Sequence, residues 1–101
     1  MKKFVTIKAD KERNLRFNFN SLMILEENLD KPVTSLWSSL SFKDINLLVW
    51  AGLLHEEPTI TKEETADIIE AVIENEGLQS LSNKLAVAIT IAFGSEKKQK
   101  A

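Results

Sequence analysis

The 101-residue chain contains no cysteine, one histidine and three glycines. Without cysteine it forms no disulfide and offers no thiolate ligand to a metal ion. The single histidine, His55, has no second histidine to complete a zinc or acid–base site, and an exposed position at a helix end is the better interpretation. The sequence also lacks a phosphate-binding loop and a serine nucleophile elbow. These absences predict a protein that is not an enzyme, with no catalytic, metal-binding or cofactor-binding residues and no cofactor.

Long hydrophobic runs are missing as well. The longest mainly apolar stretch, residues 85–93, is about half as long as a helix that crosses a bilayer. Residues 4–7 are mainly apolar, but Lys8 and Asp10 end this stretch too early for a signal peptide. Together with the lack of cysteine, this predicts a cytoplasmic protein with no membrane contact.

Charge is distributed unevenly along the chain. Residues 1–16 carry six basic and two acidic side chains. Residues 26–76 carry three basic and twelve acidic side chains, and residues 84–101 carry four basic side chains and one acidic side chain. Such a layout can orient a partner or align copies of the chain head to tail as a homo-oligomer. The alternative is that these charges are simply the solvated faces of helices. The large number of acids argues against a nucleic-acid partner.

The pattern of apolar residues predicts a mainly α fold of the α+β class, a bundle of four to five short helices with a small N-terminal β-hairpin. β-Branched and aromatic residues predict a strand at 3–8, and Leu15, Phe17 and Phe19 alternate with polar residues in a second strand at 15–19. An isolated hairpin is marginal in water, so these three side chains should pack on the helices. We expect one domain over residues 1–94, with the hairpin at 3–19, helices at 20–93 and a disordered tail at 95–101.

Ser41 with Asp44 resembles a capping box and Thr61 with Glu64 forms one, and together with Pro32 and Gly77 they divide the helical part. The predicted helices cover residues 20–29, 34–40, 42–54, 61–76 and 78–93. The first of them is capped by Asn20 or Ser21, and the segment 42–54 is apolar on nearly every face and should lie at the centre. Within it, Gly52 either permits a close crossing or weakens the helix. The apolar stripe of the next helix is Ala66, Ile69, Val72 and Ile73.

Apolar side chains exceed what these helices and the hairpin need to bury in one another. Trp37, Phe42 and Trp50 are large, and the apolar stripe of the last helix is wider than one neighbouring helix covers. Uncovered apolar patches usually mark interaction sites, although a well-filled core is the alternative. The predicted protein-interaction residues are Trp37, Leu81, Leu85, Ile89 and Phe93. On this hypothesis, Leu85→Asp loses a partner while the fold survives.

Five segments, in a fixed order and spacing, carry a family resemblance over residues 5–93. They are RFNFNSLMILEENLDKPV (16–33), SLW (35–37), FKDINLLVWAGL (42–53), TKEETADII (61–69) and LAVAITIAF (85–93). This order resembles the tail assembly chaperones of long-tailed phages and the similar small tail proteins of gene transfer agents.

The resemblance implies a non-virion helper made in the cytoplasm of the bacterial host. Such a helper binds the tape-measure protein, keeps it soluble and helps the tail-tube protein assemble around it, without catalysis. The residues alone leave two other classes open. One is a small DNA-binding or regulatory protein, and the other is an accessory subunit that acts through protein interaction.

Overall fold

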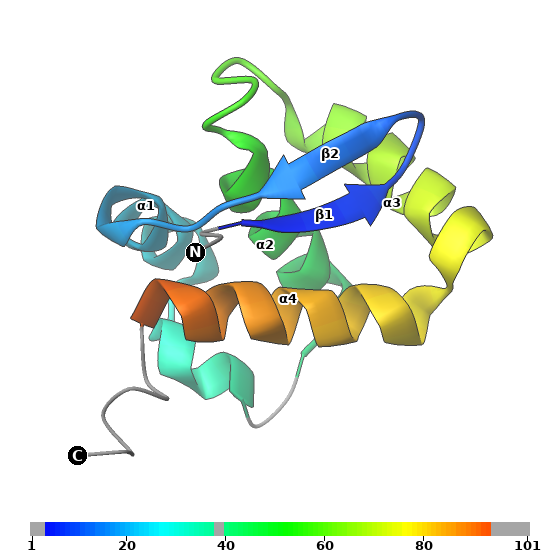
Figure 1. Ribbon diagram of the computed structural model, residues 1–101. Coiled ribbons are helices and arrows are strands. Elements are labelled where there is room, and N and C mark those ends of the chain that lie inside the picture. Colours follow the sequence, from blue (N-terminus) through cyan, green and yellow to red (C-terminus); the bar gives the residue numbers. More distant parts are fainter. Residues whose placement is uncertain (1–3, 38–39, 94–101) are drawn as a thin grey trace.

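The polypeptide folds into a set of helices that hold a short antiparallel hairpin (Figure 1). The computed structural model describes residues 4–37 and 40–93, without the side chains of Thr34, Trp37 and Phe93. In chain order the elements are β1 (Val5–Lys8), β2 (Glu12–Leu15), α1 (Phe19–Leu29), the short 3-10 helix η1 (Val33–Trp37), α2 (Phe42–Leu53), α3 (Lys62–Glu76) and α4 (Leu78–Phe93). The predicted mainly α fold with a small N-terminal hairpin is confirmed.

Helix α2 lies at the centre, as its apolar sequence predicts. It contacts α1, α3, α4 and β2, while β1 packs on α3 and α4. In Figure 1 the hairpin lies above α4 and η1 lies below it, with α1 and α3 at opposite ends. Both strands and all four α-helices contribute a side chain with no exposed surface to the core. These side chains include Ile7, Leu15, Leu25, Val49, Leu53, Val72 and Leu81.

The second strand lies earlier in the chain than predicted, so the expected strand over 15–19 is wrong. In the hairpin register Ile7 stands opposite Arg13, and both side chains therefore lie on the core-facing side. Arg13 is buried there because Asp10 lies 3.0 Å from its Nε and Glu57 pairs with its Nη1. A charged residue on the core-facing side breaks the alternation of apolar and polar residues that predicts a strand. The sequence pattern of this segment therefore indicates a loop.

Helix α1 also begins earlier than predicted. Asn18, and not Asn20, caps it, and the Asn18 side chain accepts a hydrogen bond of 2.8 Å from the backbone N–H of Ser21. Phe19 therefore lies in the first turn of the helix and is 77% exposed, whereas Phe17 is 5% exposed. The core position expected for Phe17 is confirmed, and the one expected for Phe19 is wrong.

The start and stop signals of the central helices are confirmed. Ser41 and Asp44 form a capping box at the start of α2, and Thr61 and Glu64 form another at the start of α3. Gly77 follows α3 with a φ of 93°, a conformation that glycine adopts without strain. Each of these signals is local, which explains why the sequence predicts it correctly.

Gly52 serves the close approach of α2 to the hairpin. A Cβ atom at this position would lie 3.0 Å from Leu15 Cδ2 and 3.1 Å from Phe17 Cζ. The Gly52 carbonyl also accepts a hydrogen bond of 3.0 Å from the backbone N–H of Arg16. The glycine thus allows the end of β2 and helix α2 to pack directly against each other in the core.

Helix α3 turns a different face to the core than predicted. Its buried residues are Thr65, Ile68 and Val72. Of the predicted stripe only Val72 is buried, and Ala66 and Ile73 are exposed. Thr65 is buried without loss because its hydroxyl donates a hydrogen bond of 2.9 Å to the Thr61 carbonyl. Because the buried stripe includes the polar residue Thr65, the pattern of apolar residues does not predict this face as the buried one.

Two predictions concern the ends of the chain. The disordered tail predicted at 95–101 lies outside the described residues. Of the strand predicted at 3–8, β1 covers Val5–Lys8, Phe4 precedes it, and Lys3 lies outside the described residues. The boundaries of a single domain over residues 1–94 therefore stay a prediction.

Candidate functional site

Helix α4 carries most of the residues that the sequence predicts for protein interaction. Leu81, Leu85 and Ile89 are 0%, 1% and 5% exposed and belong to the core. Their expected exposure is thus corrected, because α4 packs against β1, α2 and α3 rather than against one helix. Trp37 is the last residue of η1 and Phe93 is the last residue of α4, but the structure does not describe their side chains. A role of these residues in binding stays a prediction.

Leu85 and Ile89 nevertheless border a hollow between η1 and α4, which we call the η1–α4 groove. It has a volume of about 180 Å³. Its lining residues are Val33, Leu36, Leu40, Leu48, Ser82, Leu85, Ala86 and Ile89. Buried side chains, such as Leu48 and Leu85, form the floor, while the exposed Ala86 stands at the rim. The groove is therefore a hydrocarbon-lined surface with one hydroxyl, that of Ser82.

One carboxylate holds both ends of the segment that forms the groove wall. Asp44 Oδ2 accepts hydrogen bonds from Lys31 Nζ at 3.2 Å and from the Ser41 backbone N–H at 3.0 Å. These two residues flank the segment 32–40, so the carboxylate closes this loop at its base. Burial alone would raise the pKa of the Asp44 carboxyl, but the Ser41 and Lys31 hydrogen bonds outweigh it and hold the pKa below its ordinary value.

Helix α1 fixes the other side of the wall. Glu26 Oε2 accepts a hydrogen bond of 2.9 Å from the backbone N–H of Val33, the first residue of η1. The Ser35 N–H donates to the Pro32 carbonyl at 3.0 Å. These bonds satisfy N–H groups that a helix start leaves without partners. The wall of the groove is therefore held by polar contacts on its outer side and presents Leu36 to the groove.

The exposed side of α4 bears no charge. Lys84 is the one charged residue of this helix, and its Nζ reaches the Thr6 carbonyl at 2.9 Å and Glu76 at 2.8 Å. Its charge therefore lies toward the hairpin. The exposed residues of α4 are Leu78, Gln79, Asn83, Ala86 and Val87. Absence of charged side chains is typical of the centre of a protein interface.

Side chains from α3 and from the loop after α2 cover both edges of the hairpin. On β1, the Lys8 N–H donates to Glu76 Oε2 at 2.7 Å, and Asn75 Nδ2 donates to the Lys8 carbonyl at 2.9 Å. On β2, His55 Nε2 lies 2.7 Å from the Asn14 carbonyl oxygen. Covered edges offer little to a partner strand. A helix placed in the groove is therefore a better docking mode than an added strand.

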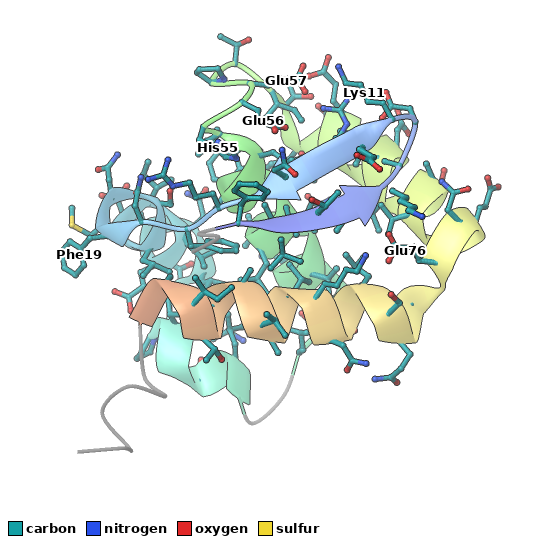
Figure 2. The ribbon with its side chains drawn as sticks, in the orientation of Figure 1. Lys11, Phe19, His55, Glu56, Glu57 and Glu76 are labelled. Atoms are coloured by element: carbon teal, nitrogen blue, oxygen red, sulfur yellow. The ribbon has the colours of Figure 1, made fainter. Side chains whose placement is uncertain are left out.

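His55, Glu56 and Glu57 follow α2 and lie beside β2 (Figure 2). The exposed position predicted for His55 is confirmed. Throughout residues 4–37 and 40–93, no group of three or more His, Cys, Asp or Glu side chains is placed to hold a metal ion. Over the same ranges, no helix has the length and apolar character needed to cross a membrane.

Trp50 borders a second, wider hollow between α2 and the start of α3. Its Nε1 donates a hydrogen bond of 3.0 Å to the Ile60 carbonyl, and Lys62 Nζ lies 5.1 Å from the centre of its ring. The ring face is thus occupied by a cation of the same molecule. Trp50 belongs to the packing of these helices and adds little apolar surface for a partner.

The η1–α4 groove and the uncharged outer face of α4 together form the candidate site. Such a site can bury apolar side chains of a partner but places no acid, base or nucleophile pair near them. In comparisons with known proteins, no family model, curated protein or solved structure matches the chain.

Proposed function

We propose that the protein is a tail assembly chaperone of a phage or prophage, which binds a helical segment of the tape-measure protein in the cytoplasm of the bacterial host. The observation that carries this proposal is the apolar η1–α4 groove beside a helix face without charge. The order of sequence segments that resembles this family supports the same function. An apolar groove is the usual receptor for an amphipathic helix, which lays its apolar side chains into it.

The size of the groove suits a chaperone that must release its client. Burying one side chain of the size of leucine or phenylalanine contributes about 1.5–3 kcal/mol, so a single groove binds weakly and reversibly. Several copies along one long client would cover several apolar segments at once. The client stays soluble while the copies are bound and becomes available when tail-tube subunits replace them.

Co-expression with the tape-measure protein of the same phage tests the proposal. The measurement is the amount of client in the soluble fraction and the amount that co-purifies with the chain. We expect the wild-type chain to keep the client soluble. Ala86→Leu fills the rim of the groove and should abolish this effect, whereas Ala66→Leu adds the same bulk at an exposed position of α3, outside the groove, and should not.

Two outcomes contradict the proposal. A client that is equally insoluble with and without the wild-type chain is not protected by it, and the chaperone function is then wrong. If Ala86→Leu and Ala66→Leu have equal effects, the client does not bind in the groove. A gel-shift experiment at low salt addresses the DNA-binding alternative, because a phosphate-binding protein gives a shift that disappears as salt is added.

A further inference from the structure

We infer that the groove recognises its client by one large apolar side chain, of the size of leucine or phenylalanine, which projects from a short helix with an uncharged contact face. This inference rests on the proposed function, because it describes the client segment that occupies the same groove. It adds the chemistry of recognition, which neither the sequence pattern nor the proposed function specifies.

The volume and lining of the groove set the size of the anchor side chain. An apolar cavity of about 150 Å³ lined by Leu, Ile and Phe accepts a benzene ring, and the η1–α4 groove measures about 180 Å³. Seven of its eight lining residues are hydrocarbon. The groove therefore holds one aromatic ring or one branched aliphatic group, and a second large side chain does not fit beside it.

Small residues on the rim allow a helix to come close enough to insert this anchor. Ser82 and Ala86 both line the groove and stand four residues apart, so they lie one above the other on the same side of α4. On the α4 side of the groove, a helix that crosses at these two positions meets only the short side chains of Ser82 and Ala86 there. Its backbone can approach α4, and its anchor can reach the floor formed by Leu48 and Leu85.

The absence of charge defines the rest of the contact face. The exposed positions of α4 are uncharged, and the charge of Lys84 is engaged by Glu76 and Thr6 on the hairpin side. A charged client residue next to the anchor would lose water without gaining an ion pair. The client helix should therefore carry apolar or small neutral residues around its anchor and keep its charges on the opposite face.

The area of the site points to a helical segment and not to a second copy of the chain. A helix of 16 residues is about 24 Å long and about 10 Å wide. The footprint of such a helix is about 240 Å², whereas each partner in a stable complex of two folded proteins buries about 800 Å². One helix covers such a site completely, and a folded copy would leave most of its interface without contacts.

Titration of the isotope-labelled full chain with synthetic helical peptides tests the inference by NMR. Two peptides are identical except at one central position, which is Phe in one and Ala in the other, and both carry their lysines on the far face. A third peptide has Glu next to the Phe. We expect the Phe peptide to shift the amide signals of residues 33–36 and 82–89 and to bind about tenfold or more tightly than the Ala peptide. The Glu peptide should bind more weakly than the Phe peptide.

The groove variants and the client experiment separate this inference from the proposed function. Ala86→Leu should abolish the shifts caused by the Phe peptide, and Ala66→Leu should keep them. Equal affinity of the Phe and Ala peptides, or no binding of either, overturns the anchor inference. This holds even if Ala86→Leu still abolishes the effect on the full client. Light scattering that shows a dimer of the wild type and a monomer of Ala86→Leu would assign the groove to a second copy and also overturn it. If Ala86→Leu does not change the solubility of the client but the Phe peptide still binds in the groove, the proposed function alone is refuted.

Discussion

Glu76 offers the sharpest test of how the helices hold the hairpin. It is the last residue of α3, and Figure 2 shows it at the corner where the chain turns into α4. Its carboxylate accepts hydrogen bonds from the Lys8 N–H of β1 at 2.7 Å and from Ser80 Oγ and Lys84 Nζ of α4, each at 2.8 Å. The side chain is 9% exposed. Glu76→Gln keeps the shape of this residue and removes its charge, so we predict a loss of stability.

The expected loss follows from the loss of charge on an acceptor with three donors. Hydrogen bonds to a charged group contribute about 1.5–3 kcal/mol, and the amide oxygen of glutamine keeps part of this. The Lys84 side chain is 32% exposed, so water screens its attraction to Glu76. We therefore expect Glu76→Gln to lower the free energy of unfolding by about 1–2 kcal/mol at pH 7.

The effect of this substitution should depend on pH. Burial alone would raise the pKa of the Glu76 carboxyl, but hydrogen bonds from Lys84, Ser80 and Lys8 outweigh it and hold the pKa below its ordinary value. A carboxyl whose pKa is lowered by folding stabilises the protein above its unfolded pKa. This stabilisation is lost as the pH falls through the folded pKa. The difference between wild type and Glu76→Gln should therefore be complete at pH 7 and shrink below about pH 4.

Urea unfolding followed by circular dichroism at pH 7 and at pH 3 measures both effects. Glu74→Gln is the matched control, because Glu74 lies on the same helix and is exposed. We expect this control to change the free energy of unfolding by less than about 0.5 kcal/mol. The reasoning is refuted if Glu76→Gln costs no more than Glu74→Gln at pH 7, or if its cost is the same at pH 3.

Five further substitutions test the boundaries of the hairpin and of α1 by urea unfolding. Asn18→Ala should cost about 1 kcal/mol through the lost cap, and Asn20→Ala should cost almost nothing; the reverse order would restore the cap that the sequence predicts. Phe17→Ala should cost about 3–5 kcal/mol and Phe19→Ala less than about 0.5 kcal/mol, so similar losses would place both rings in the core. Gly52→Val should cost at least about 1–3 kcal/mol, because its Cβ meets side chains at 3.0 and 3.1 Å; an unchanged stability would mean that the hairpin can move away.

The parts of the fold that the sequence predicts correctly depend on neighbours within about four residues. The capping boxes at Ser41 and Thr61 need one side chain and one turn of helix, and Gly77 needs only its own backbone conformation. The central position of α2 follows from its apolar faces, since a helix without a polar side has to be buried. These signals are complete in the local sequence.

The errors arise where a distant residue decides the position of a side chain. Arg13 lies in a strand on the core-facing side because Glu57, 44 residues away, pairs with it. Thr65 is buried because α3 turns by about one residue from the predicted stripe, and its hydroxyl finds a carbonyl one turn earlier. An apolar stripe also does not reveal which of its members form the core and which border a groove.

The groove itself depends on such distant contacts. Its wall stands beside α4 because Asp44 joins Lys31 to Ser41 and because Glu26 reaches the start of η1. The sequence shows Asp44 only as part of a cap for α2. Nothing in the sequence pattern predicts that the same carboxylate closes the preceding loop and so positions the candidate site.

The floor of the groove and the core of the protein are built from the same side chains. Leu85 lines the groove and is 1% exposed, so Leu85→Asp would place an unpaired carboxylate in the core and unfold the chain instead of removing a partner selectively. Binding is therefore tested by adding volume at Ala86, which is exposed. The shared floor has a physical consequence. On the proposed function, a client helix would meet a surface that packing has already fixed, so binding would order only the client, and one anchor side chain would suffice for a contact that is later released.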